Sequence, residues 1–154
     1  MTDKRNLILG DNITEELCLK YGSPIVCSRT SPVIDGFVPT AFGDLSSVVS
    51  SVGMVLNHTN SVDTLVMLPL NSFRSNWKYY GAQYTLDLMN EFTELLAAPC
   101  FFVSKLQEFI EIDTILVGIP KEDISIFDTI RETFIFEYMD RNHPKLNVKR
   151  LKLS

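Results

Sequence analysis

The chain has 154 residues, of which 45% are hydrophobic and 21% are charged, and its formal net charge is −5. This length fits one domain with its own core, and the composition excludes a disordered chain and a collagen-like sequence. No stretch approaches the roughly 18 uninterrupted apolar residues of a membrane span, and the first residues lack the apolar region of a signal peptide. We therefore expect a cytoplasmic protein, in agreement with an odd count of three cysteines that lack CxxC spacing.

Five short apolar runs along the chain predict β-strands. None of them alternates apolar with polar residues, and continuous runs of this kind are typical of strands that are buried on both faces of a parallel sheet. The runs cover residues 7–9, 25–27, 64–68, 100–103 and 114–119.

Helical patterns separate several of these runs in the first half of the chain. Asn12, with Glu15 three residues later, predicts a capping box at the start of a short first helix, which Gly22 would end. A second helix is predicted to start at Asp44, because the apolar residues that follow recur at helical spacing while serines occupy the other face.

Two further helical patterns occupy the second half of the chain. An apolar stripe predicts a helix over residues 76–97, which Pro99 then terminates. Four apolar residues spaced by four indicate another helix over residues 122–138, although residues 133–138 taken alone also fit a strand. A last strand fits residues 145–153.

Strands that alternate with helices predict a single α/β domain. We expect a three-layer, Rossmann-like domain with a mostly parallel sheet of about five strands and helices on both faces. The short link at residues 104–113 leaves open whether the strands on either side of it are antiparallel, which would make the sheet mixed. A faint echo between residues 62–69 and 112–120 reflects either duplication or two strand–helix units under the same constraints.

Candidate site residues are those that follow each apolar run, because ligands bind beyond the carboxyl ends of the strands in open α/β sheets. Asp11 is the candidate catalytic base or metal-binding carboxylate. Polar and basic residues after the runs would hold an anion such as a phosphate or a nucleotide, together with the helix N-termini at this edge. The alternative is that they are ordinary solvated loop residues. These candidates are Asn12, Arg29, Thr30, Asn71, Arg74, Lys105 and Lys121.

The sequence lacks the motifs of the best-known phosphate and metal sites. There is neither GxGxxG nor GxxxxGK[ST], which disfavours a dinucleotide cofactor and a P-loop. Neither His58 nor His143 has a partner at i+3 or i+4, so we expect no metal and no cofactor. Cys27 near Arg29 could be an activated nucleophile, but a buried core cysteine fits the pattern better.

An apolar connection at residues 32–43 is the most unusual segment. It contains Phe37 and Phe42 and is longer than most loops between secondary-structure elements. It could be a lid over a ligand, a patch buried against another subunit, or a segment that packs on the sheet edge.

The charges are divided between the end of the chain and the rest. Residues 141–154 hold five basic residues and no acid, whereas the remainder holds nine basic and 19 acidic residues. Lys149, Arg150 and Lys152 of this basic tail would contact a partner, a neighbouring copy, or the acidic body of the same chain. The acidic body disfavours nucleic acid as the partner.

Two functional hypotheses follow from these features. The first is a non-enzymatic protein-interaction or assembly subunit, bound to a protein partner or forming a homo-oligomer, on a Rossmann-like body. The second is a small enzyme or binding protein for a nucleotide-like or phosphorylated anion at the carboxyl ends of the strands. No catalytic motif decides between them, and α/β folds host many unrelated functions.

Overall fold

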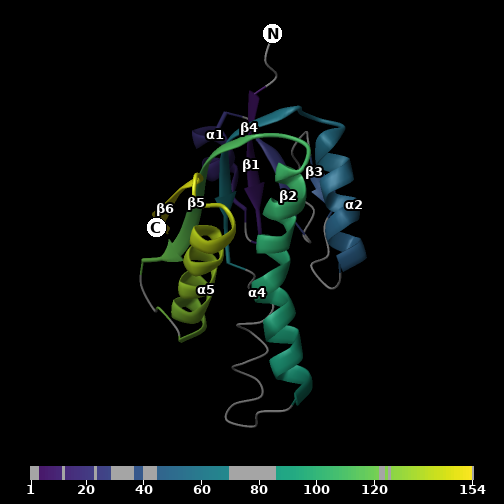
Figure 1. The fold of residues 1–154 in the computed structure, drawn as a ribbon. Coiled ribbons are helices and arrows are strands. Elements are labelled where there is room, and N and C mark those ends of the chain that lie inside the picture. The colour runs from purple at the N-terminus through teal and green to yellow at the C-terminus, as the bar shows by residue number, and fades with distance from the viewer. Residues whose placement is uncertain are drawn as a thin grey trace.

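The computed structural model of the chain describes residues 4–11, 13–22, 24–28, 37–39, 45–69, 86–121, 124 and 126–153. Strands alternate with helices along most of this length (Figure 1). The elements are β1 (Lys4–Leu9), α1 (Glu15–Lys20), β2 (Ile25–Ser28), β3 (Phe37–Pro39), α2 (Leu45–Leu56), β4 (Ser61–Met67), α4 (Leu86–Gln107), β5 (Ile112–Pro120), α5 (Ile126–Asn142) and β6 (Asn147–Leu153).

The six strands of the described residues form one sheet in the order β3-β2-β1-β4-β5-β6. Every neighbouring pair is parallel. The chain runs outward from β1 to β3, returns through α2 to β4 on the other side of β1, and then runs outward again to β6. The predicted Rossmann-like α/β fold is therefore confirmed, and its strand order is the one typical of that fold.

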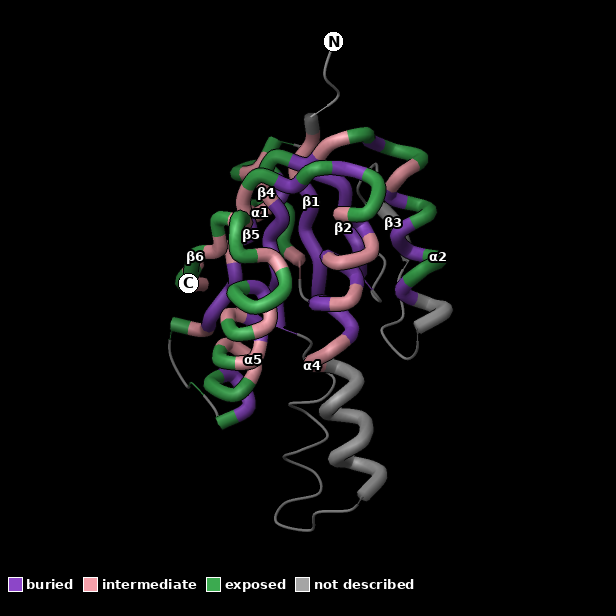
Figure 2. Tube along the Cα trace, in the orientation of Figure 1, coloured by how far each residue is buried: buried purple, intermediate pink, exposed green. Residues whose placement is uncertain are grey.

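Helices cover both faces of the sheet. On one face, α2, α4 and α5 pack over strand residues such as Leu7, Leu65 and Ile115, which are completely buried. On the other face, α1 covers Ile8 and Val66. Figure 2 shows that the buried residues are concentrated in the central strands and in the helix surfaces that face them. Consecutive residues of β1 are thus buried on opposite faces, which explains the absence of polar alternation in the strand.

One predicted strand is wrong, because residues 100–103 belong to α4. Cys100, Phe102 and Val103 are completely buried in the helix, and a short apolar run does not distinguish a strand from such a helix segment. α4 also continues through Pro99 instead of ending before it. A proline inside a helix costs about 3 kcal/mol, and we attribute its tolerance to the burial of these neighbouring side chains.

The helical crossover through α4 also settles how β4 and β5 are joined. They are a parallel pair, so the antiparallel arrangement left open by the sequence does not form. Within the predicted helix at residues 76–97, the part from Leu86 onward is helical, and the part before it lies outside the described residues. No helix in the described ranges is long and apolar enough to cross a membrane.

The cap of the first helix lies two residues later than predicted. Its N-cap is Thr14, whose hydroxyl oxygen accepts a hydrogen bond from Leu17 N at 3.1 Å, and not Asn12. Gly22 follows the helix with a φ of +64°, as its predicted role at the C-terminus requires.

The last two elements resolve the remaining alternatives. Residues 133–138 are helical and lie within α5, and the expected strand near residues 145–153 forms as β6. The buried positions of α5 include Phe127, Asp128, Ile135 and Met139.

Candidate functional site

β1 lies at the point where the chain reverses its direction across the sheet. β2 is paired on one side of it and β4 on the other. The turn after β1 is held by both neighbours, because Gly10 N donates to Cys27 O (3.0 Å) and Asp11 N donates to Pro69 O (3.3 Å). In open α/β sheets, the crevice for a ligand lies beyond the carboxyl ends of the two strands at such a point.

The residue types in this turn follow from its geometry. Gly10 has a φ of +135°, and a Cβ at this position would lie 2.6 Å from Leu68 O, so the close approach of the turn to the end of β4 requires glycine. Asp11, the predicted catalytic carboxylate, follows directly and is only 7% exposed. Ser28 at the end of β2 is completely buried. The carboxyl edge therefore combines a carboxylate and a hydroxyl group on neighbouring strands.

Arg131 is a functional candidate that sequence reasoning missed. Its Nη1 donates to Gly118 O (2.9 Å) and its Nη2 donates to Met67 O (3.2 Å), so that α5 places a guanidinium across β4 and β5. Burial lowers the pKa of Arg131 to about 10, an effect that the nearby carboxylate of Asp128 opposes. The side chain is therefore still cationic at neutral pH.

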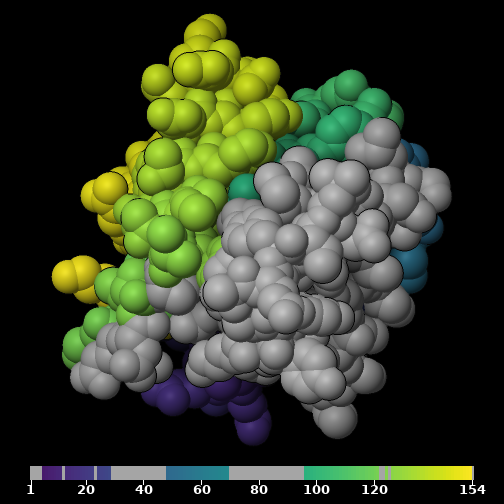
Figure 3. Space-filling view, turned by 90° about the horizontal axis from the view of Figure 1, so that it is seen from below, coloured from purple at the N-terminus to yellow at the C-terminus, as the bar shows by residue number. Residues whose placement is uncertain are grey.

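A signal for Arg131 was present in the sequence. Asp128, Arg131, Ile135 and Met139 are spaced by three or four residues, so the arginine occupies the buried line of α5. A charged residue in such a line usually has a specific polar partner. Figure 3 views the molecule from below, toward the carboxyl ends of the strands, and shows α5 along one side of this edge.

The other predicted ligand-binding residues separate into three groups. Lys121 directly follows β5 at the carboxyl edge, as predicted, and is exposed. Lys105 is not at this edge, because it lies in the last turn of α4 at the amino edge, where its Nζ is 3.4 Å from Glu108 Oε2. The remaining candidates lie outside the described residues: Asn12, Arg29, Thr30, Asn71 and Arg74.

The cysteine that could have been a nucleophile is part of the core. Cys27 is completely buried in β2, and this burial raises the pKa of its thiol far above the ordinary value. Burial also raises the pKa of Cys100 to about 12. Both thiols are therefore protonated at neutral pH, which makes them poor nucleophiles.

The predicted interaction residues that the structure describes belong to β3 and β6, the two edge strands of the sheet. The backbone of Phe37 belongs to β3, which agrees with the sheet-edge alternative for this part of residues 32–43, whereas Phe42 lies outside the described residues. Arg150 contacts its own chain, since its Nε donates to Glu132 Oε1 and its guanidinium lies 5.3 Å from the centre of the Phe136 ring. Lys149 and Lys152 in β6 are exposed.

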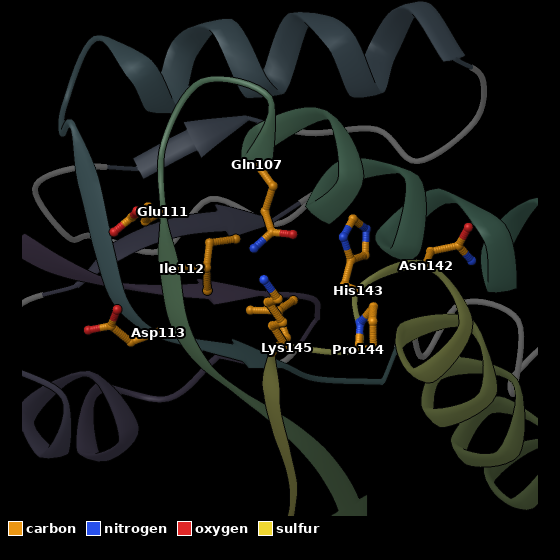
Figure 4. Close-up of a pocket in the computed structure, with 9 residues that line it drawn as sticks. Gln107, Glu111, Ile112, Asp113, Asn142, His143, Pro144 and Lys145 are labelled. Carbon is orange, nitrogen blue, oxygen red and sulfur yellow. The ribbon is translucent and has the colours of Figure 1, made fainter.

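A pocket of about 390 Å³ lies at the opposite, amino edge of the sheet (Figure 4). The end of α4, the start of β5 and the link from α5 to β6 form its walls. Its lining includes Gln107, Glu111, Ile112, His143 and Lys145. The sequence did not indicate this pocket, because its residues come from two segments that are far apart in the sequence and meet only in the folded structure.

Two other side chains fix His143 at the wall of this pocket. Its Nε2 lies 2.7 Å from Ser104 Oγ, and that oxygen lies 2.6 Å from the Tyr138 hydroxyl. Burial lowers the pKa of His143, so the imidazole is neutral at neutral pH. The three hydrogen-bonded side chains tie the α5–β6 link to both α4 and α5.

Comparison of the chain with protein-family models, curated proteins and solved structures finds no match. Within the described part of the chain, no group of three His, Cys, Asp or Glu residues is arranged to hold a metal ion. Function is therefore inferred from the geometry of the two sheet edges.

Proposed function

We propose that this chain binds a small anionic, nucleotide-like ligand beyond the carboxyl ends of β1 and β4. The observation that carries the proposal is the strand order, which reverses the direction of the chain at β1. In open α/β sheets of this kind, ligands occupy the crevice at the point of reversal. The strand order supports the position of the site, and the side chains at this edge support the class of ligand.

The charges at the carboxyl edge favour an anion with hydroxyl groups. Arg131 is cationic, Lys121 follows β5, and the N-terminus of the 17-residue helix α5 points to the same edge. Free N–H groups and the partial positive charge at a helix N-terminus attract phosphate groups. The buried carboxylate of Asp11 would accept hydrogen bonds from ligand hydroxyl groups.

The test is a calorimetric titration of the whole chain with AMP, ATP and inorganic phosphate. We expect at least one of these anions to bind, and we expect Lys121→Ala to weaken that binding by at least about tenfold. Lys105→Ala is the matched control, because it removes the same charge at the opposite edge of the sheet. Absence of binding for all three anions, or equal losses in the control, would overturn the proposal.

A second candidate function is self-association, and the start of α5 favours it. Ile124, Ile126 and Ile130 are 56%, 66% and 38% exposed, although isoleucine is among the residues most often buried. Adjacent exposed apolar side chains mark interaction surfaces. A second copy is the occupant we propose, because the basic β6 and the acidic remainder of the chain have complementary charges.

Light scattering coupled to size-exclusion chromatography tests self-association. We expect the wild-type mass to exceed that of one chain and Ile126→Ser with Ile130→Ser to lower it. Leu19→Ser is the control, because Leu19 is 73% exposed on α1, which lies on the other face of the sheet. A wild-type monomer, or an equal change in the control, would refute self-association through α5.

A further inference from the structure

The exposed side of α2 carries no charge. Residues 45–62, which contain the whole of this helix, include no Asp, Glu, Lys or Arg, although 21% of the chain is charged. On the exposed side, Val49 and Met54 are 51% and 38% accessible. The other side is buried in the core through three valines at helical spacing: Val48, Val52 and Val55. A surface helix usually has charged residues on its solvent side, whereas the centre of a protein interface is depleted in charge and enriched in methionine.

Gly53 lies on the same exposed side, four residues after Val49 and next to Met54. Its φ is outside the left-handed region, and no atom of the described residues lies within 4 Å of a Cβ built on it. Neither the backbone nor the packing of the chain therefore requires a glycine here, although glycine is unfavourable in the interior of a helix. Glycine does allow another backbone to approach closely. The position thus suits a contact made from outside the chain.

The charges of the chain favour a second copy as the partner of this surface. Two copies related by a two-fold axis present the same surface to each other, so a charged surface repels its own copy. The chain has a net charge of −5, and α1, for example, exposes Glu15 and Glu16. The exposed side of α2 is free of this repulsion, and it offers no opposite charge to a charged partner.

The position of α2 in the fold leaves this side accessible. Figure 1 shows α4 next to α2, with α5 on the far side of α4. The strand at this end of the sheet is β3, which is an edge strand. Figure 2 shows exposed residues between the buried ones along α2. A second copy can therefore reach α2 without contacting α5.

We propose that α2 packs against α2 of a second copy about a two-fold axis near Gly53. Val49 and Met54 of both copies supply the apolar contacts, and the glycines allow the two helices to approach closely. The inference does not rest on self-association through α5, because α4 separates the two surfaces. The α2 contact alone joins two chains, and both contacts together join more than two.

Analytical ultracentrifugation of the full chain with Ile126→Ser and Ile130→Ser tests the α2 contact in isolation, because these substitutions remove the contact proposed for α5. We expect an equilibrium between one and two chains with a dissociation constant of about 10–100 µM, since one pair of 12-residue helices is smaller than a standard interface. A single chain at all concentrations up to about 500 µM would overturn the proposal. If the α5 substitutions leave the wild-type mass unchanged and α2 substitutions lower it, the α5 contact is refuted and the α2 contact stands.

Charges introduced at Met54 test whether the partner is a second copy. Met54→Lys and Met54→Glu should each weaken association by at least about tenfold, because each new charge meets its own copy. An equimolar mixture of the two variants should restore association, because opposite charges then meet. Leu19→Lys is the matched control, because it adds the same charge at an exposed apolar residue on the other face of the sheet. An equal loss in the control, or a mixture that associates no better than the separate variants, would overturn the proposal.

Gly53→Ala separates association from folding. Alanine favours a helix and has open space at this position of its own chain, so the variant should keep the circular dichroism spectrum of the parent. Two added methyl groups between closely packed helices should weaken association by at least about fivefold. Association as strong as that of the parent would refute the close approach at Gly53 and with it the proposed contact.

Discussion

Gly10→Ala should destabilise the protein strongly, because the turn after β1 has no room for a side chain. A φ of +135° costs an alanine about 1–3 kcal/mol. The new Cβ would also lie 2.6 Å from Leu68 O and 2.7 Å from Leu68 Cβ. These atoms are held by the backbone at the end of β4, so relief of the overlap adds about 1–3 kcal/mol. We expect the free energy of unfolding to fall by about 4 kcal/mol in total.

Urea-induced unfolding followed by far-ultraviolet circular dichroism measures this change, and two other glycines provide controls. Gly22 has a φ of +64° but open space around it, so Gly22→Ala should cost only about 1 kcal/mol. Gly53 lies within α2 and also has open space, so Gly53→Ala should stabilise the protein by about 0.5–1 kcal/mol. A loss for Gly10→Ala no larger than that for Gly22→Ala would refute the close contact between the turn and β4.

Four further predictions concern single side chains. Thr14→Ala removes the cap of α1 and should lower the free energy of unfolding by about 1 kcal/mol in the same assay. Arg131→Met leaves the carbonyl groups of Met67 and Gly118 without their donors and should lower it by about 1–3 kcal/mol. Cys27 should resist iodoacetamide in the native protein and react only after unfolding, as measured by peptide mass spectrometry. Burial lowers the pKa of His143 in the folded state, so the unfolded state gains the proton first as the pH falls. The contribution of His143 to the free energy of unfolding should therefore be fully present above about pH 6.5 and decrease below it. His143→Gln should flatten this part of the profile of urea midpoint against pH.

The sequence predicted the parallel sheet well because its central strands are buried on both faces. Residues such as Ile8 and Leu9 point to opposite faces of the sheet and are both buried, so they form a continuous apolar run. The same logic failed at residues 100–103, because α4 is itself buried there and also produces a continuous run. At such a position the local sequence pattern indicates that the residues are buried. Whether they form a helix or a strand depends on the neighbouring elements.

The candidate site was predictable only where it depends on strand ends. Asp11 and Lys121 follow strands that were identified correctly, and both lie at the carboxyl edge. Lys105 was assigned to the wrong edge because the segment predicted as a strand before it belongs to the helix α4. This helix runs antiparallel to the strands, so its last residues lie at the amino edge of the sheet. Arg131 reaches the edge from the middle of α5, and the pocket at the amino edge joins residues 107–113 to residues 142–146. The spacing along α5 indicates that Arg131 is buried, but contacts of this kind arise from tertiary packing and leave no motif that names the partners.

The paired strands β4 and β5 connect the two edges of the sheet. They are aligned from Val62 opposite Ile112 to Met67 opposite Val117. The amino end of β5 contributes to the pocket, whereas Met67 and Gly118 near the carboxyl ends accept the hydrogen bonds of Arg131. A change within this pair would disturb both edges at once. An exposed residue such as Lys121 is therefore a position at which binding can be separated from stability.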